Sequence, residues 1–390
     1  MAISYDPFAP GVLVNPYPWY RWLRSEAPCH YVEAHDLWVI SRYDDVDAAL
    51  RNHAIFSSSE GVGFQRRSFH DMISADPPEH SRLRRLVDRQ FLPRAVAQLE
   101  PRVGAIIDSL LGPILAGGRA DLVADLAAPL PLVVIAELLG IEPERRVDFK
   151  RWSDDLLLAV GGGLDEATRA RTEESRHAMA DYIRAAAADR RAHPRTNATD
   201  IISTLVTASD NDALTTSEVI SFCMLLLIAG NETTTNTVAN GALAIMEHPD
   251  QWRVIMNDPG LIPSFVEESL RYDSPIQGFF RTTLADANVA GATIPSGARV
   301  LLLFGSANRD DHHYSDADTF LASRNPVDHL AFGKGIHYCL GAHLARLELS
   351  LLLRAILARV RRFLPDGEVV RMRNPIARGV HRLPVVVEPR

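Results

Sequence analysis

The longest uninterrupted helical pattern in the chain runs from Thr215 to Pro249. Thr215 and Glu218 have the spacing of a capping box, and no proline follows until Pro249. The pattern predicts about 31 helical residues, a length of roughly 46 Å. A helix of that length crosses a whole domain. The polar segment Gly230-Asn231-Glu232 lies in its otherwise apolar centre, and buried polar groups cost free energy unless they have partners.

The rest of the chain supports one large, mainly helical unit. From Pro77 to about Gly260 the pattern is overwhelmingly helical, whereas short strands are expected near residues 37–41, 279–304 and 383–387. We find no internal repeat and no stretch rich in Pro, Gly and Ser that would separate two halves. We therefore expect a mainly α fold with a small β portion, as a single domain over residues 1–390.

Composition excludes several classes of protein. The chain has 390 residues and a net charge of −8, so no global basic field attracts nucleic acid. Its three cysteines, Cys29, Cys223 and Cys339, are too scattered for a disulfide framework or a structural zinc site, which fits a reducing cytoplasm. The N-terminus lacks the pattern of a signal peptide, and the most apolar stretch, 222–230, is far below the roughly 20 residues that span a bilayer. We expect a cytoplasmic protein without a membrane span or a nucleic-acid partner.

The segment 332–346, Phe-Gly-Lys-Gly-Ile-His-Tyr-Cys-Leu-Gly-Ala-His-Leu-Ala-Arg, is the most informative one. Gly333, Gly335 and Gly341 permit positive φ and close approach of the backbone to a flat ligand. Cys339 stands just before a predicted helix, whose N-terminus stabilises negative charge and lowers a thiol pKa. Such a thiolate could be a nucleophile or a haem ligand, and a lone buried cysteine is most often neither.

The whole segment matches the haem-ligand signature Phe-Gly-x-Gly-x-His-x-Cys-x-Gly-x-x-Leu-Ala-Arg, and the chain therefore resembles the cytochrome P-450 family. The resemblance implies a triangular, mainly α fold with haem b between the long central helix and the cysteine helix. It implies that Cys339 is the axial thiolate of the haem iron, which favours O–O cleavage. It also assigns haem contacts to Phe332, Gly333, Gly341 and Ala229.

The tetrapeptide Glu268-Ser-Leu-Arg271 fits the Glu-x-x-Arg element of the family. Two helical residues three apart lie on one face, so the carboxylate can meet the guanidinium. Arg324 resembles the third member of that structural network. Alone, such a pair is common on exposed helices; its position about 70 residues before Cys339 favours the structural network.

The segment 229–234, Ala-Gly-Asn-Glu-Thr-Thr, resembles the oxygen-activating part of the family's central helix. Gly230 is expected to leave room for dioxygen, and Glu232 and Thr233 resemble the acid–alcohol pair that relays protons. The alternative is a polar helical turn that faces solvent. The apolar residues before it, 224–228, argue against exposure.

Haem propionates need donors or cations, and arginine suits carboxylates. His80 and Arg84, four residues apart on one predicted helix face, resemble the family's propionate ligands, and Arg281 and His337 match positions that complete the set. The same helix carries three further arginines, which form either a solvated basic face or a docking patch for an acidic electron donor: Arg82, Arg85 and Arg89.

The reaction implied is insertion of one oxygen atom from O2 into a hydrophobic organic substrate, by hydroxylation or O-dealkylation. Soluble bacterial members draw electrons from NAD(P)H through a flavin reductase and a ferredoxin. The chain has no dinucleotide fingerprint, so the donors are expected to be separate proteins. Two other classes stay open: a peroxide-using peroxygenase or haem-thiolate isomerase, and a non-catalytic haem-thiolate ligand sensor. The intact Glu232–Thr233 pair counts against both.

The residues expected to line the substrate pocket are mostly apolar, which predicts a hydrophobic substrate. They are Val62, Phe64, Leu157, Leu225, Ile228, Ile276, Phe279 and Val380. Segments 58–63, 274–283 and 305–310 resemble a bacterial subgroup that O-demethylates aromatic acids. Leu225, Ile228 and Glu60 depart from that subgroup, and an acidic Glu60 near the pocket would repel an anion. We therefore expect a neutral compact aromatic, with a terpenoid, steroid or macrolide as the alternative.

Overall fold

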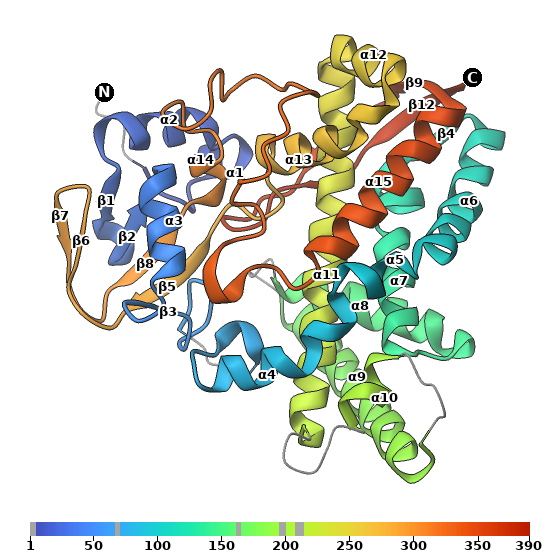
Figure 1. The fold of residues 1–390 in the computed structure, drawn as a ribbon, viewed down its shortest axis with the longest axis horizontal. Coiled ribbons are helices and arrows are strands. Elements are labelled where there is room, and N and C mark those ends of the chain that lie inside the picture. The colour runs from blue at the N-terminus through green and yellow to red at the C-terminus, as the bar shows by residue number, and fades with distance from the viewer. Residues whose placement is uncertain (1–4, 67–70, 161–164, 195–199, 207–213) are drawn as a thin grey trace.

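The structure is a computed structural model that describes residues 5–66, 71–160, 165–194, 200–206 and 214–390, without the side chains of residues 157–160. The helix α11 (Thr216–Glu247) runs through the middle of the molecule (Figure 1). Thr215 caps it, because its hydroxyl accepts the N–H of Glu218 while the Glu218 carboxylate accepts the N–H of Thr215. The predicted long helix and its capping box are confirmed.

Helices from the middle and C-terminal parts of the chain pack against α11, and α15, which follows the cysteine, crosses close to it (Figure 1). The described α-helices before α11 are α1 (Pro10–Val14), α2 (Tyr17–Glu26), α3 (Tyr43–Arg51), α4 (Glu79–Val87), α5 (Pro93–Ala97), α6 (Glu100–Gly117), α7 (Pro129–Leu139), α8 (Arg146–Val160), α9 (Glu166–Ala192) and α10 (Ile201–Val206). Those after it are α12 (Pro249–Asn257), α13 (Ile262–Tyr272), α14 (Phe304–Ala307) and α15 (Ala342–Arg359).

The β portion is small and lies mostly in the part of the molecule that holds the N-terminus (Figure 1). One sheet has the order β1 (Cys29–Val32), β2 (Leu37–Ile40), β8 (Arg299–Leu302), β5 (Phe279–Thr283) and β3 (Phe56–Ser57), with only β2 and β8 parallel. A second sheet joins β4 (Arg119–Asp121), β12 (Pro384–Pro389) and β9 (Val360–Pro365). Two strand pairs complete the described part, β6 (Ala287–Val289) with β7 (Ala292–Ile294) and β10 (Val370–Arg371) with β11 (Val380–Arg382). The mainly α fold with a small β portion is confirmed.

The cysteine helix ends earlier than its sequence suggests. The pattern predicts a helix to about Arg362, whereas α15 ends at Arg359 and β9 begins at Val360. Val360 pairs with Pro389 and Phe363 with Val387 of β12. Hydrogen bonding to the C-terminal strand β12 therefore makes residues 360–362 a strand, although their local sequence favours a helix.

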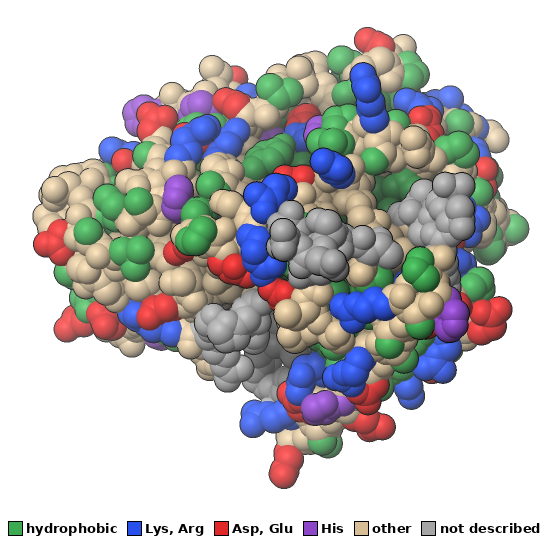
Figure 2. Space-filling view, turned by 60° about the horizontal axis from the view of Figure 1, so that its bottom comes forward, with side chains coloured by type: hydrophobic (Ala, Val, Ile, Leu, Met, Phe, Trp, Pro, Cys, Tyr) green, Lys and Arg blue, Asp and Glu red, His purple; other side chains and the backbone are tan. Residues whose placement is uncertain are grey.

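The surface mixes charges of both signs. On the face drawn in Figure 2, Lys and Arg side chains stand among Asp and Glu, and hydrophobic side chains are dispersed. Of the helices in the described ranges, none combines the length and the apolarity that a membrane span requires.

Candidate active site

A cavity of about 200 Å³ is lined by α11 on one side and by the segment 332–341 on the other. We call it the main cavity. Its α11 residues recur every three or four positions, which is the spacing of one helix face. They are Phe222, Leu225, Leu226, Ala229, Gly230, Thr233, Thr234 and Thr237.

Cys339 lines the main cavity at the end of a tight loop. Its N–H donates to Phe332 O over 2.9 Å, which closes the loop, and Gly333 and Gly335 take φ of +66° and +67°. A side chain on Gly335 would meet Leu50 O at 2.5 Å, so only glycine fits there. Gly341 differs from the expectation: its φ is −82°, the ordinary value for its place before α15.

The surroundings of Cys339 raise the pKa of its thiol, whereas the sequence predicts that they lower it. Burial raises its pKa, and the N–H of Gly341 and the charges of Arg84 and Arg346 offset this only in part. The expectation that the helix N-terminus dominates is therefore corrected, because desolvation of the thiolate outweighs the local dipoles. A metal ion would deprotonate a thiol in this position outright.

Four donor or cationic side chains meet at the main cavity near the cysteine loop, namely His80, Arg84, Arg281 and His337. The rings of His80 and His337 lie 4.5 Å apart between centroids. Both nitrogens of His80 and Nε2 of His337 are buried without a hydrogen-bond partner among the described residues. Arg281 is buried and donates to Phe280 O at 2.8 Å, and burial lowers its pKa to about 10.

Unpaired buried donors of this kind need a partner. Burial lowers the pKa of His80, and Arg84 lowers it further, whereas Asp76 and Asp88 offset the shift in part. Burial lowers the pKa of His337 to about 2, and the neighbouring charges of Arg281 and Arg84 add to this shift. Arg84 bonds Asp88 at 2.6 Å and Tyr338 O at 2.8 Å. The four side chains line the main cavity, and donors of this kind suit carboxylates; we call the cluster the anion site.

Thr233 and Glu232 take different places on α11. The Thr233 hydroxyl lines the main cavity and donates to Ala229 O at 2.6 Å. Glu232 lies on the neighbouring flank, makes no hydrogen bond to a described residue, and has a pKa raised to about 7 by burial. Glu232 and Thr233 are adjacent in sequence, but successive residues of a helix point in different directions, so only Thr233 faces the cavity.

Only some of the predicted substrate residues line the main cavity. Leu225, Ile276 and Phe279 line the main cavity. Ile228 does not, because it lies with Glu232 on the flank of α11, and Val380 is 1% exposed within the core beside the same helix. The side chain of Leu157 lies outside the described residues.

The segment 57–66 is held away from the main cavity. Phe64 packs on the rings of Phe8 and Phe280, and Val62 O accepts the N–H of Phe280. Neither Val62 nor Phe64 is among the residues that line the cavity, which corrects the expectation from sequence. The packing of this segment on β5 accounts for the difference.

Glu60 carries no unbalanced charge toward the main cavity. Its carboxylate accepts from Arg66 at 2.6 Å and from Thr282 at 2.7 Å, and the pKa of Glu60 is lowered, first by the Thr282 hydroxyl. The expected repulsion of an anionic substrate therefore has no structural basis, because Arg66 neutralises the acid.

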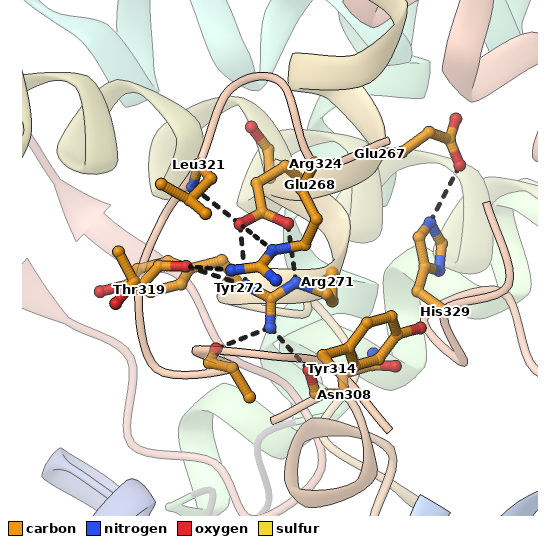
Figure 3. Close-up of polar contacts among 12 residues, drawn as sticks. Glu267, Glu268, Arg271, Tyr272, Asn308, Tyr314, Thr319, Leu321, Arg324 and His329 are labelled. Atoms are coloured by element: carbon orange, nitrogen blue, oxygen red, sulfur yellow. Dashed lines mark hydrogen bonds and ion pairs between the residues drawn. The ribbon is translucent and has the colours of Figure 1, made fainter. Parts of the chain in front are cut away.

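Glu268, Arg271 and Arg324 meet in a buried cluster (Figure 3). Arg271 and Glu268 are fully buried and form two bonds of 2.7 and 2.8 Å, and Arg324 reaches Glu268 at 3.1 Å. Arg271 also donates to the carbonyls of Asn308, Ala317 and Thr319. The cluster ties α13 to the long loop that leads to Cys339.

A second ion cluster lies next to it. Glu267 accepts two bonds from Arg346 of α15, at 2.6 and 2.8 Å. It also lies 3.1 Å from His329 (Figure 3). The Arg346 guanidinium stands 4.6 Å from the centre of the Phe332 ring. Glu267 therefore connects α13 to both ends of the cysteine segment.

The structure adds site residues that sequence reasoning missed. Glu348 of α15 lines the main cavity, is 2% exposed, and has one oxygen without a partner. Burial raises its pKa to about 8. In the sequence, Glu348 stands between Leu344 and Leu352 on one face of the predicted helix. An acidic residue on such an apolar face could have indicated a site residue. Ile135 of α7 also lines the cavity, and nothing in its own sequence context distinguishes it.

A family model described as "Cytochrome P450" matches residues 163–258 and 256–384. The chain belongs to the cytochrome P450 family. It is similar to a steroid C26-monooxygenase of Mycobacterium tuberculosis, with 36% identity over 95% of this chain and 93% of that protein. It is also similar to cytochrome P450 monooxygenase PikC of Streptomyces venezuelae, with 37% identity over 95% and 91% of the two chains.

Solved structures of cytochromes P450 share the fold. CYP109Q5 from Chondromyces apiculatus has a TM-score of 0.90 and 37% identity, covering 99% of this chain and 98% of its own. CYP109E1 from Bacillus megaterium, in complex with testosterone, has a TM-score of 0.87 and 34% identity, covering 95% and 99%. The expected P450 fold is confirmed, and the protein is a P450 monooxygenase, an oxidoreductase acting on hydrophobic substrates with O2. The family carries haem with a cysteine thiolate as axial ligand.

Proposed function

We propose that residues 1–390 form one P450 domain in which Cys339 is the axial ligand of haem b. The observation that carries this assignment is the position of Cys339 in the wall of the main cavity, beside a cluster of unpaired donors. When bound, the haem supplies the activation of dioxygen. Phe332, Gly333, Gly341 and Ala229 all line the same cavity and are proposed to contact the macrocycle.

The anion site is proposed to hold the haem propionates. His80, Arg84, Arg281 and His337 would donate to the two carboxylates, which would supply the missing partners of the buried nitrogens. Pairing with a carboxylate would also remove much of the cost of burying Arg281, whose pKa burial otherwise lowers.

Proton delivery is assigned to Thr233 and Glu232. The Thr233 hydroxyl is in the cavity wall and can hold a proton there or pass one on. Glu232 has a pKa near 7, which suits a group that takes up and releases protons at neutral pH. Since Glu232 lies off the cavity, the two groups are proposed to communicate by a rotation of the Glu232 side chain or through water.

The electron donor is proposed to be a separate ferredoxin, itself reduced by an NAD(P)H-dependent flavin reductase. Arg85 is exposed on α4, the helix whose His80 and Arg84 line the cavity, and Arg89 is exposed in the short 3-10 helix Asp88–Phe91 that follows it. They suit contact with an acidic protein. Arg82 is engaged by Glu79 and Glu218, so its charge is largely compensated. We place the enzyme in the cytoplasm, where the free thiols of Cys29 and Cys223 stay reduced.

The substrate is proposed to be an uncharged hydrophobic compound. Ile135, Phe222, Leu225, Ile276 and Phe279 form an apolar wall around Thr233. Steroids are the first class to test, because one relative is a steroid C26-monooxygenase and one structural neighbour holds testosterone. A neutral compact aromatic is the second, since Phe222 and Phe279 offer ring faces.

An optical titration of the ferric protein tests the substrate class. Steroids, neutral alkylphenols and aromatic carboxylates are added separately while the haem spin state is followed. We expect a saturable shift with uncharged compounds only. A shift with the carboxylates alone would contradict the proposal.

Turnover tests the function itself. The shifting compound is incubated with a surrogate ferredoxin, its reductase, NADPH and isotopically labelled O2. One labelled oxygen atom in the product supports the monooxygenase. Product with hydrogen peroxide alone and none with ferredoxin would favour a peroxygenase, and binding without any product would favour a ligand sensor.

A further inference from the structure

A second cavity adjoins the main cavity at Thr237. It has a volume of about 50 Å³ and is lined by side chains of α11, α13, α15 and β9, with Leu122 and Leu126 closing it. Thr237 lines both this cavity and the main cavity, so it forms a shared wall. Thr237 is one helical turn beyond Thr233 on α11.

The second cavity offers little to water. Its polar side chains are Thr237 and Ser269, and both hydroxyls donate within their own helices, to Thr233 O and Phe265 O at 2.8 Å. All other lining side chains are hydrocarbon or Gly241. A buried cavity of this type stays dry and takes up small apolar molecules such as xenon.

Gly241 lines the second cavity at a position where a larger residue would fit. Gly241 is buried in the middle of α11, where glycine is about 1 kcal/mol less favourable than alanine. A Cβ atom there would meet only Ser269, with Oγ at 3.6 Å and Cβ at 3.8 Å, which is ordinary contact. Alanine would therefore fit, extend the packing and favour the helix.

We propose that the second cavity is a docking site for dioxygen beside the haem site. Size and polarity exclude the organic substrate and favour a diatomic apolar molecule, and dioxygen is the reactant with that chemistry. Thr237 is a lining residue that the two cavities share. The inference rests on the proposed function, which supplies the use of dioxygen.

Xenon is the probe of the site, since its binding needs no redox chemistry. Crystals of the ferric haem protein are pressurised with xenon. We expect xenon in the second cavity of the unmodified protein, less of it in Gly241→Ala, and none in Ala242→Val, which fills the cavity from the same helix. Gly104→Ala in α6 is the matched control, because it makes the same change in a helix with open space around it.

The association of O2 with the ferrous protein tests the role of the site. Stopped-flow rates are expected to fall roughly twofold or more in Ala242→Val, because the filled cavity no longer holds dioxygen, and to stay unchanged in Gly104→Ala. Absence of xenon from the unmodified protein would overturn the site, and an unchanged O2 rate in Ala242→Val would overturn its role. The ferrous carbon-monoxide spectrum of each variant separates these results from loss of the haem–thiolate centre itself.

Discussion

The Cδ1 atom of Ile135 lies 2.8 Å from the position that a Cβ atom on Gly230 would occupy. Ile135 belongs to α7 and is 1% exposed, Gly230 belongs to the centre of α11, and both line the main cavity. The resemblance to the family implies that Gly230 leaves room for dioxygen. The structure shows that the space beside Gly230 is occupied first by Ile135, so the missing side chain lets α7 pack against α11.

Gly230→Ala is expected to force Ile135 aside and to destabilise the haem protein by about 1–3 kcal/mol, as overpacking does. Ile135→Val removes the Cδ1 methyl and costs about 0.5–1.5 kcal/mol alone. In the double variant the two penalties should not add, because the second change removes the clash made by the first. Thermal unfolding of the four proteins measures this coupling, and strictly additive penalties would contradict it.

Thr233→Ala is expected to separate electron consumption from product formation. Loss of the hydroxyl in the cavity wall should lower the rate of substrate oxidation about 10²-fold, while NADPH consumption continues and hydrogen peroxide accumulates. Product, NADPH and peroxide are measured together.

Thr235→Ala is the matched control, since the Thr235 hydroxyl donates to Ala127 O and does not line the cavity. Equal coupling in Thr233→Ala and Thr235→Ala would contradict the assignment of Thr233.

Glu348→Gln is expected to change the pH dependence of stability. Because the folded pKa of Glu348 is raised from 4.5 to about 8, the folded chain keeps a proton that the unfolded chain has lost. Between pH 4.5 and 8 unfolding therefore releases this proton, and stability falls as pH rises. At pH 7 the variant should be more stable by up to about 3 kcal/mol, since one pKa unit is worth about 1.4 kcal/mol.

Thermal midpoints of the haem protein and of Glu348→Gln, recorded from pH 5 to pH 8, check the Glu348 prediction. The difference between the two should grow with pH. Parallel curves over that range would show that Glu348 is not a buried neutral acid.

Arg271→Met is expected to destabilise the protein by about 3–5 kcal/mol, because it leaves the fully buried Glu268 without its bidentate partner. Chemical unfolding of the haem protein measures the loss. Arg253→Met, on the exposed face of α12, is the control and should change stability by less than about 0.5 kcal/mol. Similar effects of the two changes would contradict the importance of the buried cluster.

Local patterns predicted much of the fold. The capping residues Thr215 and Glu218 and the absence of proline locate α11, and the glycine loop before Cys339 locates the cysteine in the cavity wall. Such features depend on neighbours within a few residues, which a single sequence contains.

The details of the pocket depend on tertiary packing, which local patterns do not contain. Leu225 and Ile228 are both apolar and lie one turn apart, yet only Leu225 faces the cavity, because the rotation of α11 is fixed by its contacts. Glu60 is neutralised by Arg66 through the fold of a loop, and Ile135 arrives from a helix almost 100 residues away in sequence from Gly230. The same reasons explain why Val380 is a core residue instead of a pocket residue.

The central claim is that Cys339 supplies the thiolate that binds the haem iron. The ferrous carbon-monoxide spectrum tests it most directly, in the unmodified protein, in Cys339→Ala and in the control Cys29→Ser, whose cysteine lies in β1 away from the cavity. We expect the red-shifted thiolate band in the unmodified protein and in Cys29→Ser, and its complete loss in Cys339→Ala. Survival of the band in Cys339→Ala would show that another residue is the ligand and would contradict the account.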